Sequence, residues 1–294
     1  MTPTRFFGLR NFGAVAAGLL SMCVVGVPCR AQDAPESAPP TTTAPTATTS
    51  TLAITGTAPV QADLTLLARA MRALSETASF SYEGDIEIKG VGRGLTFAGR
   101  ERVRFSAKRP GKVRSDILMT LGDAPKGKRY ITVSDGTEVW VHRPGTREFT
   151  RAPLDPAEFT RNLTGFGILG ALYFNRNLLS GVGLITTENA AQFTELLKKE
   201  NIDLSGTYET VDDTEMPVFV MALSRQKMTF RFFVDPKRAV LRRLEVTAHE
   251  KNMDFTMTET VVRQNAAPLL PKGEFKFVPP PGHRKTARIA IELL

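Results

Sequence analysis

Residues 80–89 read Phe-Ser-Tyr-Glu-Gly-Asp-Ile-Glu-Ile-Lys, and this stretch decides the fold class. Apolar and polar side chains alternate with a period of two, which is typical of a β-strand with one buried face and one face in water. Residues 95–108 repeat the pattern, with Leu, Phe, Val, Phe and Ala on one face and three Arg and a Lys on the other. Glu101 conflicts with the second segment because it falls on the apolar face. Two such segments in succession predict an antiparallel sheet.

The rest of the chain after residue 60 continues this alternation around a helical middle. Helices are predicted at 63–74, 156–179 and 188–199, with Asp63 and Thr187 as N-caps. Further strands are predicted at 113–121, 129–134, 138–143, 148–151, 208–211, 218–224, 228–234, 240–249 and 253–263. The fold class is therefore expected to be mainly β (α+β), with helices covering one face of an antiparallel sheet.

Residues 1–31 have the layout of a secretory signal peptide. Arg5 and Arg10 precede an apolar run at 12–27, which is short for a membrane span of about 20 residues. Small residues at Cys29 and Ala31 fit a cut before Gln32. An alternative is lipoprotein anchoring at Cys29, against which Pro28 argues. We therefore expect export to the periplasm.

Cleavage would also remove both cysteines and part of the charge. A mature chain without thiols has no disulfides, thiolate metal sites or cysteine nucleophiles. The segment holds three of the 38 basic residues and none of the 30 acids, so the mature net charge is 35 − 30 = +5. This mild excess is compatible with peripheral contact with an anionic membrane, and without a dense basic block it does not favour nucleic acid.

Residues 32–59 are rich in Pro, Thr and Ala and are predicted to be a disordered tether, followed by a single domain at 60–294. The domain offers no pattern for catalysis, and neither an enzyme activity nor a cofactor is predicted. His142, His249 and His283 fall in different segments without a second ligand at metal spacing. Ser134-Asp135-Gly136 lacks a nucleophile elbow, and Asp-Gly is typical of a hairpin turn.

Three short motifs, in order along the domain, resemble those of the periplasmic lipoprotein-carrier (LolA-like) superfamily. They are Arg-Pro-Gly-Lys-Val-Arg at 109–114, the hairpin Val-Ser-Asp-Gly-Thr-Glu-Val-Trp-Val-His at 133–142, and Phe-Lys-Phe-Val-Pro-Pro-Pro-Gly at 275–282. The resemblance spans about residues 61–285. It implies a curved, unclosed antiparallel β-barrel whose concave face is covered by helices and holds acyl chains. The sequence has His142-Arg143-Pro144 where carriers have an aromatic-Asp-Pro, and no residue matches the carrier's functional arginine.

From the resemblance and the Met/Phe content of the strands, we expect an apolar cavity for lipid or lipoprotein acyl chains, because methionine adapts to ligands of variable shape. Filling of an ordinary core is the alternative interpretation of the same residues. The predicted lining is Phe80, Phe97, Phe105, Met119, Met221, Phe230, Phe232, Phe255 and Met257.

A second hypothesis is a regulatory or scaffold module that binds an envelope protein partner through a basic strand face. The predicted partner face is Arg100, Arg102, Arg104 and Lys108. These four residues are called the basic stripe below. A solvated outer face of the sheet explains the basic stripe without a partner. Trp140, the one tryptophan, is expected to be partly buried and close to the mouth of the cavity, since a large aromatic on a strand usually buries most of its area.

Overall fold

A computed structural model describes residues 61–92, 95–122, 127–154, 165–174, 176–250, 253–287 and residue 289. The predicted signal peptide and tether lie outside these residues, as do residues 155–164 of the predicted middle helix.

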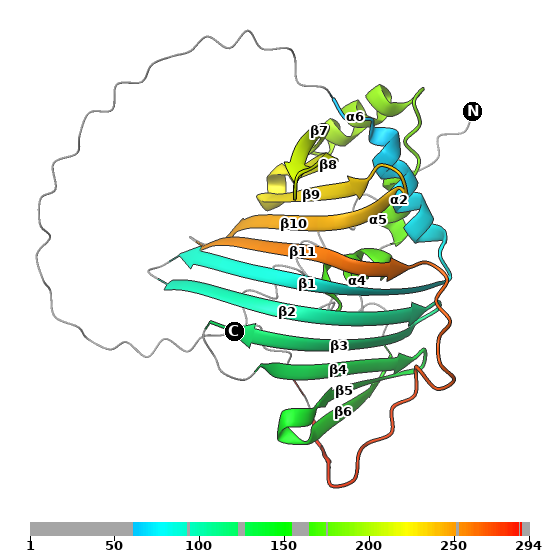
Figure 1. Ribbon diagram of the computed structural model, residues 1–294, viewed down its shortest axis with the longest axis vertical. Coiled ribbons are helices and arrows are strands. Elements are labelled where there is room, and N and C mark those ends of the chain that lie inside the picture. Colours follow the sequence, from blue (N-terminus) through cyan, green and yellow to red (C-terminus); the bar gives the residue numbers. More distant parts are fainter. Residues whose placement is uncertain are drawn as a thin grey trace, which may run out of the picture.

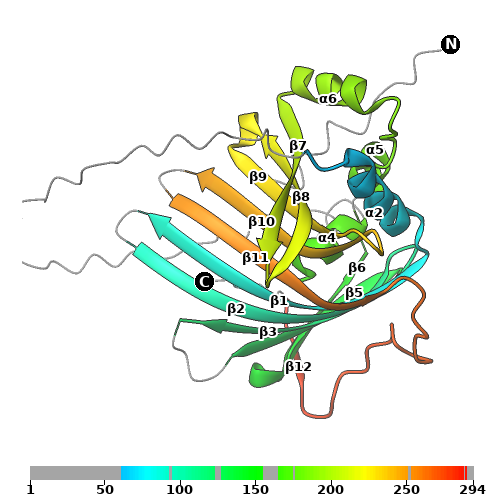
Figure 2. The same ribbon diagram turned by 45° about the horizontal axis from the view of Figure 1, so that its top comes forward.

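Twelve strands form one sheet in the order β12-β6-β5-β4-β3-β2-β1-β11-β10-β9-β8-β7 (Figure 1). Neighbours are antiparallel except β12 and β6, which are parallel. The strands are β1 (Ser79–Gly92), β2 (Leu95–Lys108), β3 (Lys112–Leu121), β4 (Lys128–Asp135), β5 (Glu138–Arg143), β6 (Glu148–Pro153), β7 (Ile202–Val211), β8 (Thr214–Leu223), β9 (Met228–Asp235), β10 (Val240–Glu250), β11 (Met253–Asn265) and β12 (Arg284–Lys285). The sheet curves strongly without closing, which confirms the predicted architecture (Figure 2).

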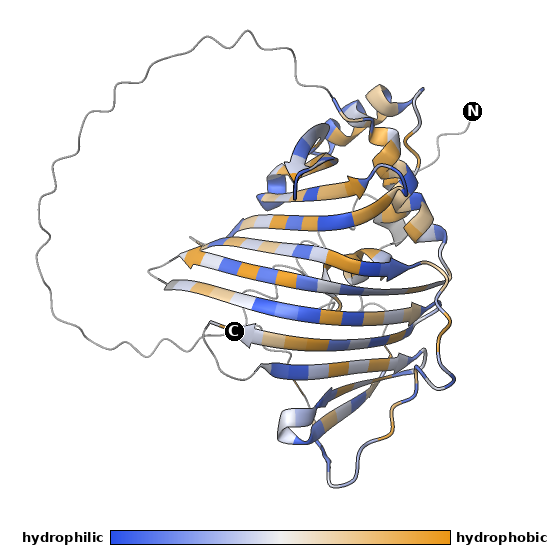
Figure 3. Ribbon diagram, in the orientation of Figure 1, coloured by the Kyte–Doolittle hydropathy of each residue, from blue (hydrophilic) through white to orange (hydrophobic). Residues whose placement is uncertain are grey.

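Alternation along the strands gives the sheet two distinct faces (Figure 3). In β1, the side chains of Phe80, Tyr82, Ile86 and Ile88 are buried, as is Gly84, while the odd-numbered residues between them are partly or fully exposed. The face that carries these four residues is called the concave face below, and the opposite one the convex face. β7 is longer than predicted because Gly206 and the polar residues around it weaken the alternation at its start.

Among the described residues, one helix precedes the strands and three lie between β6 and β7: α2 (Leu64–Glu76), α4 (Gly167–Phe174), α5 (Arg176–Val182) and α6 (Ala190–Lys199), with single 3-10 turns at Pro144–Thr146 and Ser224–Gln226. Asp63 caps α2 by accepting from the Thr65 N–H at 2.9 Å, as predicted. Thr187 is not the cap of α6. The Asn189 side chain closes the preceding turn by accepting from the Thr186 N–H, and the helix begins at Ala190.

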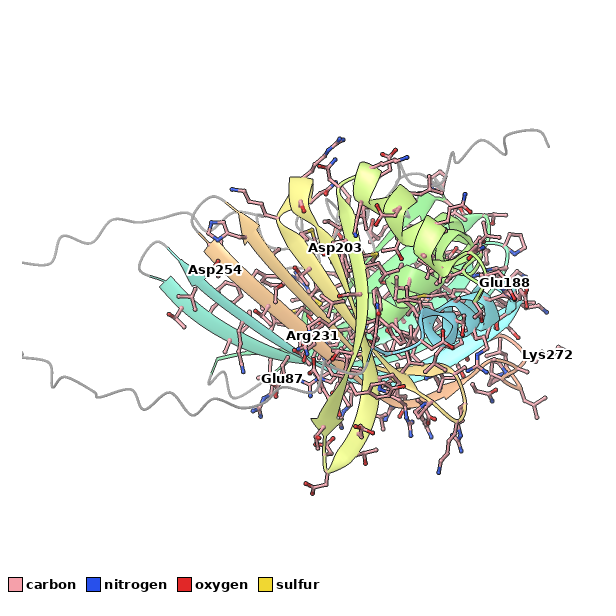
Figure 4. All side chains as sticks on the ribbon, turned by 90° about the horizontal axis from the view of Figure 1, so that it is seen from above. Glu87, Glu188, Asp203, Arg231, Asp254 and Lys272 are labelled. Carbon is pink, nitrogen blue, oxygen red and sulfur yellow. The ribbon has the colours of Figure 1, made fainter. Side chains whose placement is uncertain are left out.

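The helices lie toward one end of the strands. Seen from above, they gather at the end where β1 begins, and β1, β2, β10 and β11 continue beyond them toward the end marked by Asp254 (Figure 4). Residues 266–287, called the C-terminal strap below, leave β11, pass over the convex side and end on β6 (Figure 2). Helices and strap therefore lie on opposite faces of the sheet.

Candidate binding face

The structure brings the nine predicted lining residues together on the concave face. Eight belong to one buried apolar cluster, and Phe97 packs against it. They come from six strands, and cross-strand register aligns them: Phe230 of β9 faces Met221 of β8 on one side and Val246 of β10 on the other. The rings of Phe230 and Phe232 are nearly parallel, with centroids 6.2 Å apart. The result is an apolar wall of aromatic and methionine side chains.

Part of this wall packs directly against the helices. The Phe80 ring stacks on Tyr173 of α4 with centroids 5.4 Å apart, and Phe105 meets Phe166 edge-on at 5.8 Å. Phe97 and Phe255 instead both face Gly90 near the end of β1. At this far end the strands extend past the helices (Figure 4). The far end is thus the part of the wall that lies beyond the described helices.

Gly90 shapes that far end. It faces Phe97 across β1 and β2, and a Cβ at this position would occupy the space of the Phe97 ring. The glycine therefore lets an aromatic ring lie flat on the backbone of the neighbouring strand. A side chain at Gly90 would push Phe97 off the wall.

Two buried glutamates interrupt the apolar wall. Glu101 of β2 and Glu259 of β11 face Ile86 of β1 from its two sides, and their exposed fractions are 7% and 0%. Oε2 of Glu259 accepts the Leu169 N–H at 2.8 Å, near the start of α4. Oε1 of each glutamate has no hydrogen-bond partner among the described residues. The Tyr82 hydroxyl beside Glu259 donates its single proton to the Phe166 carbonyl.

The environment of the two glutamates favours their neutral forms. Burial raises the pKa of Glu101 to about 7, and the charge of Glu259 adds to the effect. Burial also raises the pKa of Glu259 to about 7, against the opposing hydrogen bond from Leu169. Above this pH, both would be carboxylates in an apolar surrounding, which is costly. The position of Glu101 on an apolar strand face was visible in the sequence. Glu259 also falls on the apolar face of its strand, in phase with Met257 and Val261, but it was not singled out from the sequence.

Arg109, at the start of the first carrier-like motif, ties the helices together. Its guanidinium donates to the Tyr173 carbonyl at 2.6 Å and to the Ser75 carbonyl, and it lies 4.2 Å from the centre of the Tyr173 ring. These contacts join the C-terminal ends of α2 and α4. The motif therefore marks a structural contact in this chain.

The predicted partner face lies on the convex side and is largely ion-paired. Arg102 contacts Asp85 at 2.8 Å, Arg104 contacts Glu83 at 3.2 Å, and each pair faces across β1 and β2. Arg100 faces Glu87 at 3.8 Å, whereas Lys108 faces Ser79. The basic stripe is thus a cross-strand row of opposite charges, which is a common way to stabilise an exposed sheet face.

Two of the histidines, which lie in different segments of the sequence, meet in the structure. Nε2 of His142 on β5 lies 2.9 Å from Nδ1 of His283 on the strap. Phe277 of the strap packs on both His142 and Trp140, with ring centroids 5.4 and 6.4 Å away. Trp140 is half-buried, as predicted, but it lies under the strap on the convex face and not at a mouth of the concave one. The strand phase is fixed by the pairing of Trp140 with Val133, which the sequence did not show.

Within the described part of the chain, no cluster of three or more His, Cys, Asp or Glu side chains has a geometry able to hold a metal ion. No helix there combines the length and apolar character needed to cross a membrane.

Comparison with known proteins gives similarities of fold only. No family model and no curated protein matches the chain. An uncharacterized conserved protein from Thermus thermophilus is similar with a TM-score of 0.39 and 9% identity, over 75% of this chain and 97% of that one. LprF from Mycobacterium bovis has a TM-score of 0.37 and 12% identity, over 71% and 95%. A putative outer membrane lipoprotein-sorting protein domain from Vibrio parahaemolyticus has a TM-score of 0.31 and 8% identity, over 72% and 95%. We draw no functional conclusion from similarities this weak.

Proposed function

We propose that this chain is an exported, non-enzymatic protein that holds acyl chains of a lipid or lipoprotein against the concave face of its sheet. The observation that carries the proposal is the convergence of nine Phe and Met side chains from six strands on one wall. The motifs shared with lipoprotein carriers agree with it. The basic stripe offers less support for a protein partner, because three of its four charges already face acids.

The energy of such binding comes from burial alone. Each methylene removed from water contributes about 0.8 kcal/mol, so eight methylenes contribute about 6 kcal/mol. Micromolar affinity needs about 8 kcal/mol, which a slightly longer chain supplies without any polar contact. The unbranched, polarizable side chains of Met221 and Met257 suit a wall that has to repack around such a guest.

Charge placed on the wall should prevent uptake of a fluorescent fatty acid. Phe230→Lys and Met257→Lys should each abolish binding by the purified mature protein, because an ammonium there cannot be desolvated against an acyl chain. Leu118→Lys is the matched control, since Leu118 is 47% exposed on the convex face. Circular dichroism would establish that each variant is folded, and Phe230→Ala, which adds no charge, should weaken uptake less.

Native mass spectrometry of protein purified from its own envelope provides the second readout. Lipid adducts on the wild type and their loss from Met257→Lys support the proposal. If the wild type carries no lipid and takes up no fatty acid, the acyl-chain proposal is wrong.

A further inference from the structure

A row of hydrogen-bond donors crosses the convex face. Ser81 of β1 faces Asn265 of β11 on one side and Ser106 of β2 on the other. Ser106 in turn faces Arg114 of β3. Four neighbouring strands thus align a carboxamide, two hydroxyls and a guanidinium, with no acid among them.

This row lines a pocket of about 480 Å³ between the sheet and the C-terminal strap. The strap contributes Pro268, Leu269 and Glu274 to the opposite wall. The row and the strap thus line the pocket on the convex side, and its lining also includes Tyr82 and Phe105, which belong to the buried cluster of the concave face. A ligand held by the row and the strap is on the opposite face of the sheet from an acyl chain bound on the concave face.

The arginines and acids beside the row neutralise one another. Glu83 lies between Arg104 at 3.2 Å and Arg263 at 2.6 Å. The Asp116 carboxylate accepts from Nε of Arg129 at 2.8 Å. Each of these two acids is thus paired with arginines other than Arg114.

The donors of the row have no such partners. Among the residues that the structure describes, the side chains of Ser81, Ser106 and Arg114 make no hydrogen bond or ion pair. Oδ1 of Asn265 accepts from the Ala267 N–H at 2.9 Å, which leaves its amide N–H groups as donors. A guanidinium beside hydroxyls and amide N–H groups is the donor set that binds an oxyanion.

We propose that this pocket binds a phosphate group, carried by a small phosphate ester or by a phospholipid headgroup. Arg114 and the two serines hold the phosphate oxygens. Glu274, an acid on the strap wall, accepts from a hydroxyl or ammonium group attached to the phosphate. The proposal is independent of the acyl-chain proposal, because the two sites lie on opposite faces of the sheet.

Titration calorimetry with inorganic phosphate and with O-phosphoethanolamine tests the site. Arg114→Gln should weaken both by about tenfold or more, the effect of losing one charge-assisted hydrogen bond. Arg100→Gln makes the same charge change on the same face outside the pocket and should alter the affinity by less than about twofold. Ser106→Ala, which keeps the charge, should weaken binding by a smaller factor than Arg114→Gln. Equal losses in Arg114→Gln and Arg100→Gln, or no binding by the wild type at millimolar ligand, would overturn the proposal.

Co-sedimentation with vesicles separates the two sources of phosphate. Binding to phosphatidylglycerol vesicles that is lost in Arg114→Gln and retained in Arg100→Gln assigns the pocket to a lipid headgroup. Calorimetric binding of O-phosphoethanolamine without vesicle binding assigns it to a soluble ester. Vesicle binding that Arg114→Gln leaves unchanged excludes the headgroup.

Discussion

Glu101 and Glu259 link the stability of the concave face to pH. A carboxyl group whose pKa is about 7 in the folded protein and 4.5 otherwise holds its proton more tightly when folded. The folded state therefore binds more protons than the unfolded state between these two values. Their contribution to the free energy of unfolding falls as pH rises through this window and is lowest above pH 7.

Glu101→Gln should remove this dependence for one of the two groups. At about pH 8 the variant should be more stable than the wild type by roughly 1–3 kcal/mol, and at about pH 4.5 the gain should vanish. Urea unfolding at both pH values measures the difference. Glu87→Gln, an exposed glutamate of the neighbouring strand, should show no such change. A Glu101→Gln gain of equal size at both pH values would contradict the argument from burial.

At the scale of elements, α4 approaches the sheet closely at Gly167. This residue has a φ of +68°, and a Cβ there would strike the Tyr82 hydroxyl and lie 2.6 Å from Oε1 of Glu259. The start of the helix can therefore approach the glutamate only because residue 167 lacks a side chain. The same close approach lets Glu259 accept the Leu169 N–H.

Gly167→Ala should lower the free energy of unfolding by about 2–4 kcal/mol, through the positive φ and the clash together. Gly181→Ala is the matched control, because a Cβ at Gly181 in α5 meets nothing within 4 Å. That change should be neutral or stabilising by up to about 1 kcal/mol. Chemical denaturation of both variants at one pH compares them. Equal effects would show that α4 does not depend on this close approach.

At the scale of the whole molecule, the strap joins the middle of the sheet to its edge. It leaves β11, and its last residues add β12 to β6, where the Arg284 N–H donates to the Arg147 carbonyl and the Thr286 N–H to the Phe149 carbonyl, both at 2.8 Å. The edge strand β6 is thereby covered by the chain's own backbone, which protects it from pairing with another chain.

Acid should loosen this strap at the His142–His283 contact. Burial lowers the pKa of His142 below 6.5, and neighbouring His283 and Arg129 lower it further. The unfolded or detached state therefore takes up the proton first, so stability contributed by the contact is lost as pH falls below about 6.5. Hydrogen exchange at Arg284 and Thr286, corrected for intrinsic rates, should be faster at about pH 5 than at pH 7.5, and Trp140 fluorescence should shift to the red.

His142→Phe should remove the pH dependence, because it keeps an aromatic ring against Phe277 and cannot be protonated. Fatty acid should leave the Trp140 emission unchanged in either protein, since Trp140 lies on the convex face. If the strap of the wild type is equally protected from hydrogen exchange at both pH values, the histidine contact does not make it sensitive to pH.

The amino-acid sequence by itself determined which residues form strands and which of them share a face. Alternation in residues 80–89 and 95–108 needs only the geometry of a strand, in which neighbouring side chains point to opposite sides. The cap at Asp63 could also be predicted, because an N-cap contacts residues only two or three positions away and is therefore local in the sequence. The nine Phe and Met residues were predicted to share one wall on this basis together with the resemblance.

Only the tertiary structure decided which faces and side chains meet. Glu101 and Glu259 come together because β1 pairs with β2 on one side and with β11 on the other, and that register is set by contacts distant in sequence. The same holds for His142 and His283, 141 positions apart. Strand pairing also turned the basic stripe into ion pairs and aligned Arg114 with two serines. Periodicity is a local property of the chain, whereas register and strand order depend on how the whole sheet folds.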